Sequence, residues 1–137
     1  MNAQVRDVPL PDALEAPAPA ALLERQRDIL ESIVRGDPLC EILAALCRAV
    51  EAEAGGRVRA SIFLVDTERR CLRTGAAPSL PADYNAAVDG IGIAVGVGTC
   101  AEAAATGHVV VTSDLASAPS WEGFRHLPLA LGLHAAW

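Results

Sequence analysis

The cysteine at position 100 is the side chain of this sequence best placed to do chemistry. Cys100 follows a glycine-rich stretch, residues 92–98, which includes Gly96 and Gly98. Glycines at this spacing predict tight turns that lead into a helix, and Cys100 would stand in the first turn of that helix. The dipole and free amides of a helix N-terminus stabilise a thiolate, so we expect a lowered thiol pKa. A small buried side chain packed beneath the glycine loop is the alternative.

Nucleophilic catalysis by Cys100 would need a base or a second thiol beside it. His108 and His126 are possible bases, but no spacing requires either to approach Cys100. The 3 histidines show no HxxxH pattern and the 4 cysteines form no CxxC pair, so we expect no metal site and free thiols in a reducing compartment. We therefore assign no catalytic residue and no metal ligand, and keep Cys100 as the single catalytic alternative.

The glycine-rich stretch also matches a dinucleotide-binding pattern superficially. Residues 96–101 fit GxGxxA, and Asp114 lies 18 residues beyond Gly96. Only the 9 residues 99–107 would separate Gly98 from the next strand, whereas a parallel βαβ crossover needs about a dozen or more. We therefore expect the glycines to give the backbone freedom to turn. The helix amides that follow them would favour an anion or a carboxyl group.

Trp121 and Phe124 form an aromatic pair in a loop that also holds Pro119. Such a loop could close over a pocket. It could equally anchor a long connection to a core poor in aromatic residues, which make up 4% of the chain. Both interpretations stay open.

Length and charge narrow the class of protein. A chain of 137 residues fits one domain. Its net charge of −6 and its lack of a basic cluster disfavour nucleic-acid binding, which depends on Lys and Arg neutralising phosphates. Uncharged stretches fall short of the roughly 20 apolar residues that cross a membrane, and the first residues do not resemble a signal peptide. We expect a cytoplasmic protein with no nucleic-acid or membrane partner.

The elements that must position these residues begin after a tail. Residues 1–20 hold four prolines among alanines, which predicts a flexible lead-in. From Ala21 to Arg35 apolar pairs recur at near-heptad spacing between charged residues, which predicts a helix. Docking on the domain's own core and pairing with a second helix both fit this pattern. We favour a homodimer formed through this helix.

A second helix and a hairpin follow. Asp37 is expected to cap the helix, Pro38 stands at its first turn, and residues 55–56, both glycine, end it. Its apolar stripe comprises Leu39, Ile42, Leu43, Leu46 and Val50. Residues 58–66 and 71–76 predict two strands joined by a charged turn, and both faces of the first are apolar, as in a sheet covered on both sides.

The remaining chain predicts shorter elements. A helical turn is expected at residues 83–88. Thr99 and Glu102 have capping-box spacing at the start of a helix that Gly107 ends. Strands are expected at residues 108–113 and 133–137, with a short helix at 127–131 between them. The fold class is α+β.

The order of these elements, with the segments SIFLVD, GVGTCAEAAATG, HVVVTSDLA and APSWEGFRHL, resembles GAF sensor domains of bacterial signalling proteins over residues 21–137. The resemblance implies an α/β/α arrangement with a central antiparallel sheet flanked by helices and a small-molecule pocket on one face. GAF domains occur beside PAS domains, histidine kinases and cyclic-di-GMP enzymes, so it also implies a regulatory, ligand-sensing role. It leaves the ligand and any cofactor undefined. The ligand-binding residues implied are Tyr84, Gly96, Gly98, Thr99, Cys100, Val111, Asp114, Trp121 and Phe124.

The sequence departs from the GAF pattern in two respects. GAF domains continue with a further strand, which pairs beside SIFLVD, and a closing helix, so we expect a C-terminally truncated domain with open strand edges. A looser resemblance to free methionine-(R)-sulfoxide reductases aligns their motif with residues 98–101, but residues 133–137 offer no thiol where those enzymes hold their reactive cysteine. We expect a non-catalytic sensor. A thiol redox enzyme using Cys100, or a dimerisation module with a vestigial pocket, are the alternatives.

Overall fold

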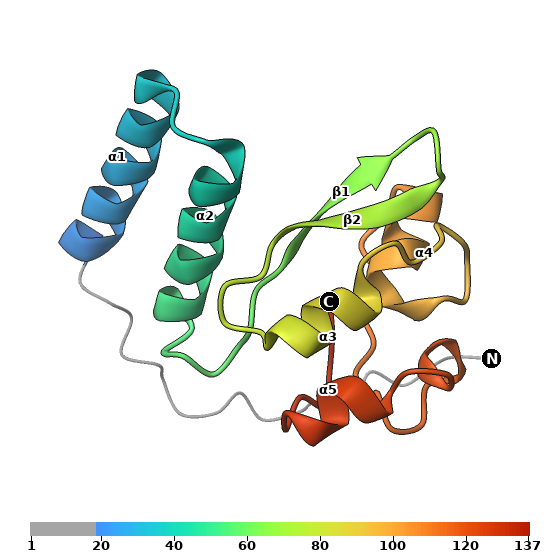
Figure 1. The fold of residues 1–137 in the computed structure, drawn as a ribbon. Coiled ribbons are helices and arrows are strands. Elements are labelled where there is room, and N and C mark those ends of the chain that lie inside the picture. Colours follow the sequence, from blue (N-terminus) through green and yellow to red (C-terminus); the bar gives the residue numbers. More distant parts are fainter. Residues whose placement is uncertain (1–18) are drawn as a thin grey trace.

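The computed structural model describes residues 19–137 as an α+β arrangement in which α1 and α2 stand on one side of a β hairpin and the shorter helices on the other (Figure 1). The tail predicted for residues 1–20 lies outside the described residues, except that Pro19 and Ala20 already belong to α1. The elements are α1 (Pro19–Arg35), α2 (Leu39–Glu53), β1 (Ile62–Asp66), β2 (Cys71–Ala76), α3 (Ala82–Val88), α4 (Gly98–Thr106), the 3-10 turn η1 (Pro119–Trp121) and α5 (His126–Ala130).

The two long helices form an antiparallel pair fastened at both ends. An ion pair of 2.5 Å joins Arg25 to Glu53 near the open end. At the turn, Asp37 accepts hydrogen bonds from Ser32 and Arg35. The prediction that Asp37 caps α2 is therefore wrong, because its carboxylate is occupied by α1 and the residue before α2, Pro38, provides no side-chain cap.

Helix α2 packs closely on β2. A Cβ at Gly75 would lie 2.9 Å from Leu43 Cδ1 and 3.1 Å from the carbonyl oxygen of Ile62, so only glycine lets the helix approach the strand to this extent. Cys47, on the next turn of α2, is buried, and its Sγ lies 3.8 Å from the carbonyl oxygen of Ala76. Of the apolar stripe predicted for α2, Leu43 packs on the hairpin, whereas Leu46 and Val50 line the cavity described below and Leu39 is 58% exposed.

The sheet is smaller than the sequence predicts. β1 pairs antiparallel with β2 alone, with an irregularity between Ile62 and Phe63. Residues 58–61 were expected to extend β1, but they are not a strand, since the N–H of Ala60 donates to the buried carboxylate of Glu51 (2.8 Å) instead of to a strand neighbour. Residues 90–93 run along the other edge of β2, where the N–H of Leu72 donates to the carbonyl of Ile91 (2.9 Å).

The strand predicted at residues 108–113 is also wrong for most of its length. Thr112 forms an isolated bridge with Ala136, through hydrogen bonds of 2.7 and 2.9 Å. The strand predicted at residues 133–137 is likewise wrong, since this bridge is its one paired position among the described residues. Val109 and Val111 are 87% and 68% exposed. The high β propensity of these valines is therefore not realised, since neither belongs to a strand.

Helix α4 begins at the glycine-rich stretch and ends where predicted, at Gly107, whose φ is +70°. The predicted capping box of Thr99 and Glu102 does not form, because α4 already begins at Gly98 and no side chain caps its N-terminus. The carboxylate of Glu102 reaches back to the N–H of Gly96 (3.1 Å), but Thr99 makes no cap and its hydroxyl points into the core. Among the helices of residues 19–137, none combines the length and the apolar character needed to cross a membrane.

Candidate ligand-binding cavity

A cavity of about 530 Å³ lies between β1, α2, α3, the start of α4 and the segments around η1 and α5. This volume is within the range of roughly 300–1,000 Å³ found for small-molecule sites. Apolar side chains dominate its walls, with a few hydroxyl, thiol and cationic groups among them. The wall residues include Cys47, Arg57, Arg59, Phe63, Tyr84, Gly98, Thr99, Cys100, Trp121, Phe124 and His134.

The structure brings six of the nine predicted binding residues together around this cavity: Tyr84, Gly98, Thr99, Cys100, Trp121 and Phe124. The other three lie outside its lining. The N–H of Gly96 donates a hydrogen bond to the carboxylate of Glu102, and Val111 is exposed to solvent. The carboxylate of Asp114 accepts hydrogen bonds from the hydroxyl of Ser117 and from the N–H of Ala116. These bonds lower the pKa of Asp114, the bond from Ser117 contributing most.

A short chain of hydrogen bonds fixes the aromatic loop onto α4. Trp121 is buried, and its indole N–H donates to the hydroxyl oxygen of Thr99 (3.1 Å). Since that oxygen accepts from Trp121, the O–H of Thr99 can donate to Thr112 (2.8 Å). Trp121 therefore anchors the long loop, one of the two interpretations that the sequence left open, and the edge of its ring forms part of the cavity wall.

Gly98 allows Phe124 to lie directly over the start of α4. The φ of Gly98 is +59°, and a Cβ there would lie 2.9 Å from Phe124 Cζ. Phe124 in turn packs on Trp121 with ring centroids 4.7 Å apart. The backbone freedom that the sequence predicts for these glycines is thus used at Gly98 to bring an aromatic wall against the helix N-terminus.

The thiol of Cys100 differs from the expectation. Its side chain lines the cavity and is exposed there, and partial burial by the walls raises its pKa. This direction is opposite to the lowering expected from the helix terminus, and its cause is desolvation of the charged form. The neighbouring Tyr84 also has a raised pKa, chiefly from burial and then from repulsion by a Cys100 thiolate.

Several wall residues were missed by the sequence analysis. Cys47 and Phe63 were interpreted as parts of elements, and Arg57 and Arg59 received no role. The apolar inner face of residues 58–66 was a signal for Phe63, since a strand apolar on both sides must be covered on both sides. No local pattern pointed to the two arginines. Within residues 19–137, no group of three or more His, Cys, Asp or Glu is arranged to hold a metal ion.

Comparison with known proteins adds one informative relative. The methyl sulfide methyltransferase-associated sensor of Methanosarcina acetivorans is 34% identical over 116 residues, which is 85% of this chain. By its name, that relative is a sensor. The chain spans 12% of the length of this relative, so the similarity concerns one segment of a much larger protein. No family model matches the chain, and no solved structure matches it.

Proposed function

We propose that this chain is a regulatory sensing module of the GAF type, which binds a small molecule in the cavity between β1 and α4 and carries out no reaction on it. The observation that carries the proposal is the convergence of six residues, chosen from sequence, on one cavity of about 530 Å³. Similarity to a segment of a protein named as a sensor supports the same role. A ligand would act through different affinities for two states of the module.

The experiment is a fluorescence titration with N-phenyl-1-naphthylamine, an uncharged apolar probe that brightens on leaving water. Cys100→Phe places a ring into the cavity, and we expect it to weaken saturable binding about tenfold or more, because the space is then filled. Cys40→Phe is the matched control, since Cys40 is exposed on α2 outside the cavity. The proposal would be refuted if Cys100→Phe left the affinity for the probe unchanged, or if the wild-type chain showed no saturable binding at all.

A thiol redox activity is the second candidate, favoured by one observation. Cys47 and Cys100 line the same cavity, so a second thiol accompanies the candidate nucleophile. Two thiols could reduce a sulfoxide to a sulfide, forming a disulfide and water. The raised pKa values of both thiols, caused chiefly by burial, work against it at neutral pH. Turnover of free methionine-(R)-sulfoxide that Cys100→Ala abolishes would establish this activity in place of simple sensing.

The surface of α1 supports a homodimer, which we propose as the form in which the module works. Leu23, Leu30 and Val34 are 64%, 62% and 87% exposed, and they line a shallow groove along the helix. Their spacing of seven and four residues puts them on one side. Half-buried residues such as Ile29 mark the other side, which faces α2.

A further inference from the structure

The charged residues that line the cavity are all cationic or potentially cationic. They are Arg57, Arg59 and His134, and among residues 19–137 no aspartate or glutamate belongs to the lining. The chain as a whole has the opposite balance, with 17 acidic residues against 11 lysines and arginines. A cavity lined by one sign of charge concentrates ions of the other sign, so this lining favours an anion within an acidic protein.

The two arginines stand in the segment that joins α2 to β1. Arg59 Nη1 donates to the carbonyl oxygens of Gly56 (2.9 Å) and Val58 (3.2 Å), which holds its guanidinium in place and leaves other N–H groups unused. Within residues 19–137, neither Arg57 nor Arg59 forms an ion pair. Arg57 and Arg59 are thus exposed residues of the cavity lining, and neither is paired with a carboxylate of the described residues.

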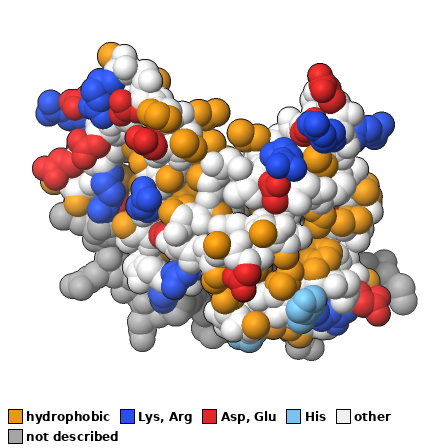
Figure 2. Space-filling view, viewed as in Figure 1, with side chains coloured by type: hydrophobic (Ala, Val, Ile, Leu, Met, Phe, Trp, Pro, Cys, Tyr) orange, Lys and Arg blue, Asp and Glu red, His pale blue; other side chains and the backbone are white. Residues whose placement is uncertain are grey.

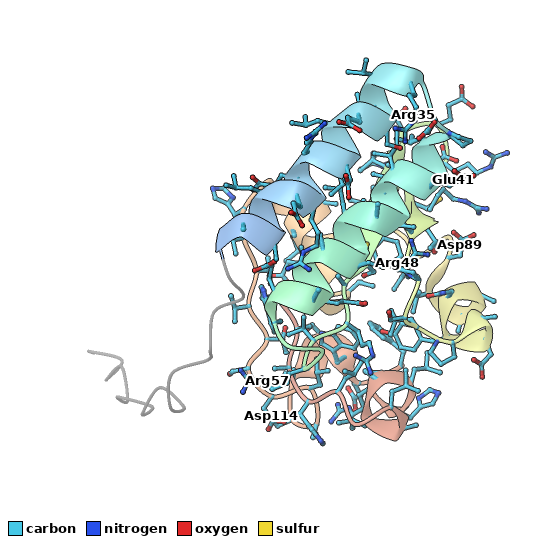
Figure 3. The ribbon with its side chains drawn as sticks, turned by 90° about the vertical axis from the view of Figure 1, so that its left-hand side faces the viewer. Arg35, Glu41, Arg48, Arg57, Asp89 and Asp114 are labelled. Atoms are coloured by element: carbon cyan, nitrogen blue, oxygen red, sulfur yellow. The ribbon has the colours of Figure 1, made fainter. Side chains whose placement is uncertain are left out.

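The nearby carboxylates are engaged elsewhere. Glu51 accepts hydrogen bonds from the N–H of Ala60 (2.8 Å) and the hydroxyl of Ser79 (2.5 Å), and it does not line the cavity. Asp114 lies at the same end of the molecule as Arg57 in Figure 3, but its oxygens accept from its own loop. Asp114 is close enough to His134 for that histidine to contribute to lowering its pKa. Asp114 therefore interacts with His134, whereas Arg57 and Arg59 form no ion pair with a described carboxylate.

The rest of the lining is apolar and aromatic. Trp121 and Phe124 present ring surfaces, and Phe63 adds another from β1. Tyr84 adds a hydroxyl that no described residue hydrogen-bonds, beside the neutral thiol of Cys100. A ligand that matches these walls has an apolar, ring-bearing body and carries its charge on one part only.

We propose that the cavity takes an amphipathic organic anion, a ring-bearing molecule with one carboxylate, sulfonate or phosphate group held by Arg57 and Arg59. The inference rests on the proposed sensing function and names the chemical class of its ligand. Guanidinium groups suit such an anion because their planar N–H groups pair with two oxygens at once. The aromatic walls hold the body of the ligand out of water, and the arginines set its orientation.

The test compares two probes that share one skeleton. 8-Anilinonaphthalene-1-sulfonate carries a sulfonate, and N-phenyl-1-naphthylamine lacks it. Titrations use the full chain as wild type, as the double variant Arg57→Gln/Arg59→Gln, and as the matched control Arg48→Gln/Arg70→Gln. The control removes two exposed arginines that form no ion pair within the described residues and lie outside the lining.

The proposal expects the double variant to bind the sulfonate about tenfold more weakly, as for lost charge-assisted hydrogen bonds, with the uncharged probe unaffected. It also expects that added salt weakens only the sulfonate. Sulfonate affinity equal in the double variant and the control would overturn the anion inference, while leaving the cavity as a site for the uncharged probe. If Cys100→Phe abolishes binding of both probes, and Arg57→Gln/Arg59→Gln weakens binding of the sulfonate, the sulfonate occupies the same cavity as the uncharged probe. Failure of both probes to bind saturably would overturn the sensing function together with this inference.

Discussion

At the start of α4 two physical effects act on one thiol in opposite directions. The amides and dipole of a helix N-terminus stabilise a thiolate, whereas removal from bulk water destabilises it. Burial raises the pKa of Cys100, which is the direction of desolvation and not that of a helix terminus. The thiol is therefore neutral near pH 7, which suits a cavity wall better than a nucleophile.

This balance predicts how Cys100 reacts. Alkylation by iodoacetamide requires the thiolate, so we expect the rate at Cys100 to be low at pH 7 and to rise only at a pH above that of an ordinary cysteine. Cys40, exposed on α2, is the internal control. Mass spectrometry of peptides after timed labelling from pH 7 to 10 gives both rates. A rate for Cys100 that reaches its maximum at lower pH than that for Cys40 would contradict the raised pKa.

Gly98 is the second residue with a specific structural requirement. Gly98→Ala would add a Cβ 2.9 Å from Phe124 Cζ at a φ of +59°. We expect a loss of roughly 1–3 kcal/mol in the free energy of unfolding, because the ring must move and the backbone is strained. Gly123→Ala is the matched control, since a Cβ there meets no atom within 4 Å. Urea titrations of the two variants that give equal stability would show that Phe124 does not pack on Gly98.

Among the elements, α2 is joined to two walls of the cavity by a single carboxylate. Glu51 is buried on α2 and accepts hydrogen bonds from Ala60, before β1, and from Ser79, before α3. Leu80 and Tyr84, which follow Ser79, line the cavity, as Ala60 itself does. Glu51 therefore links the position of α2 to the segments that a ligand would touch.

Removing the carboxylate of Glu51 should lower the free energy of unfolding. Glu51→Ala leaves the N–H of Ala60 and the hydroxyl of Ser79 without their acceptor, and we expect a loss of about 2–4 kcal/mol in the free energy of unfolding. Glu51→Gln, which keeps an oxygen for Ala60, should lose less. Glu41→Ala tests the general cost of a truncated glutamate on α2, because Glu41 is exposed. If Glu51→Ala is no less stable than Glu41→Ala, as thermal unfolding followed by circular dichroism would show, the carboxylate does not hold the two walls.

The elements also show which features could be predicted from sequence. Periodicity located α1 and α2, and glycine located the end of α4 at Gly107, because these signals act within a few residues. Strand predictions at residues 58–61 and 108–111 were wrong because a strand needs a partner. The N–H of Ala60 donates a hydrogen bond to Glu51 instead, and Val109 does not belong to a strand. Pairing is a property of the assembled chain that local composition does not contain.

Of the residues that line the candidate cavity, some could be predicted from the sequence and others could not. Thr99 and Cys100 follow a glycine-rich turn at the start of α4, and the GAF resemblance implied them and Tyr84 as pocket residues, which is how these three could be selected. Arg57 and Arg59 could not, since they line the cavity only through the course of the connection between α2 and β1. A charged residue in a connection looks like an ordinary solvated side chain until the fold shows what lies beside it.

For the whole molecule, the distribution of side chains over the surface bears on assembly. Charged groups crowd the two projecting ends, at α1–α2 and at the turn of the β hairpin, and apolar groups reach the surface between and below them (Figure 2). On α1 itself the exposed apolar side chains share one side, away from α2. An exposed stripe of this kind gains stability when a second copy removes it from water, at roughly 25 cal/mol per Å².

This surface leads to a prediction about mass in solution. The proposed homodimer would have twice the chain mass of 14.2 kDa, and Leu30→Lys should convert it to the monomer, because an ammonium group cannot be buried in an apolar seam without a partner. Val95→Lys adds the same charge at a residue that is 68% exposed outside α1, so the dimer should persist there. Size-exclusion chromatography with light scattering, over a range of concentrations, measures both variants. A wild-type chain that is monomeric at every concentration, or a dimer that survives Leu30→Lys, would mean that the stripe on α1 does not pair with itself. The probe titrations on the monomeric variant then separate the two roles, since a cavity enclosed by a single chain should bind its ligand whether or not α1 is paired.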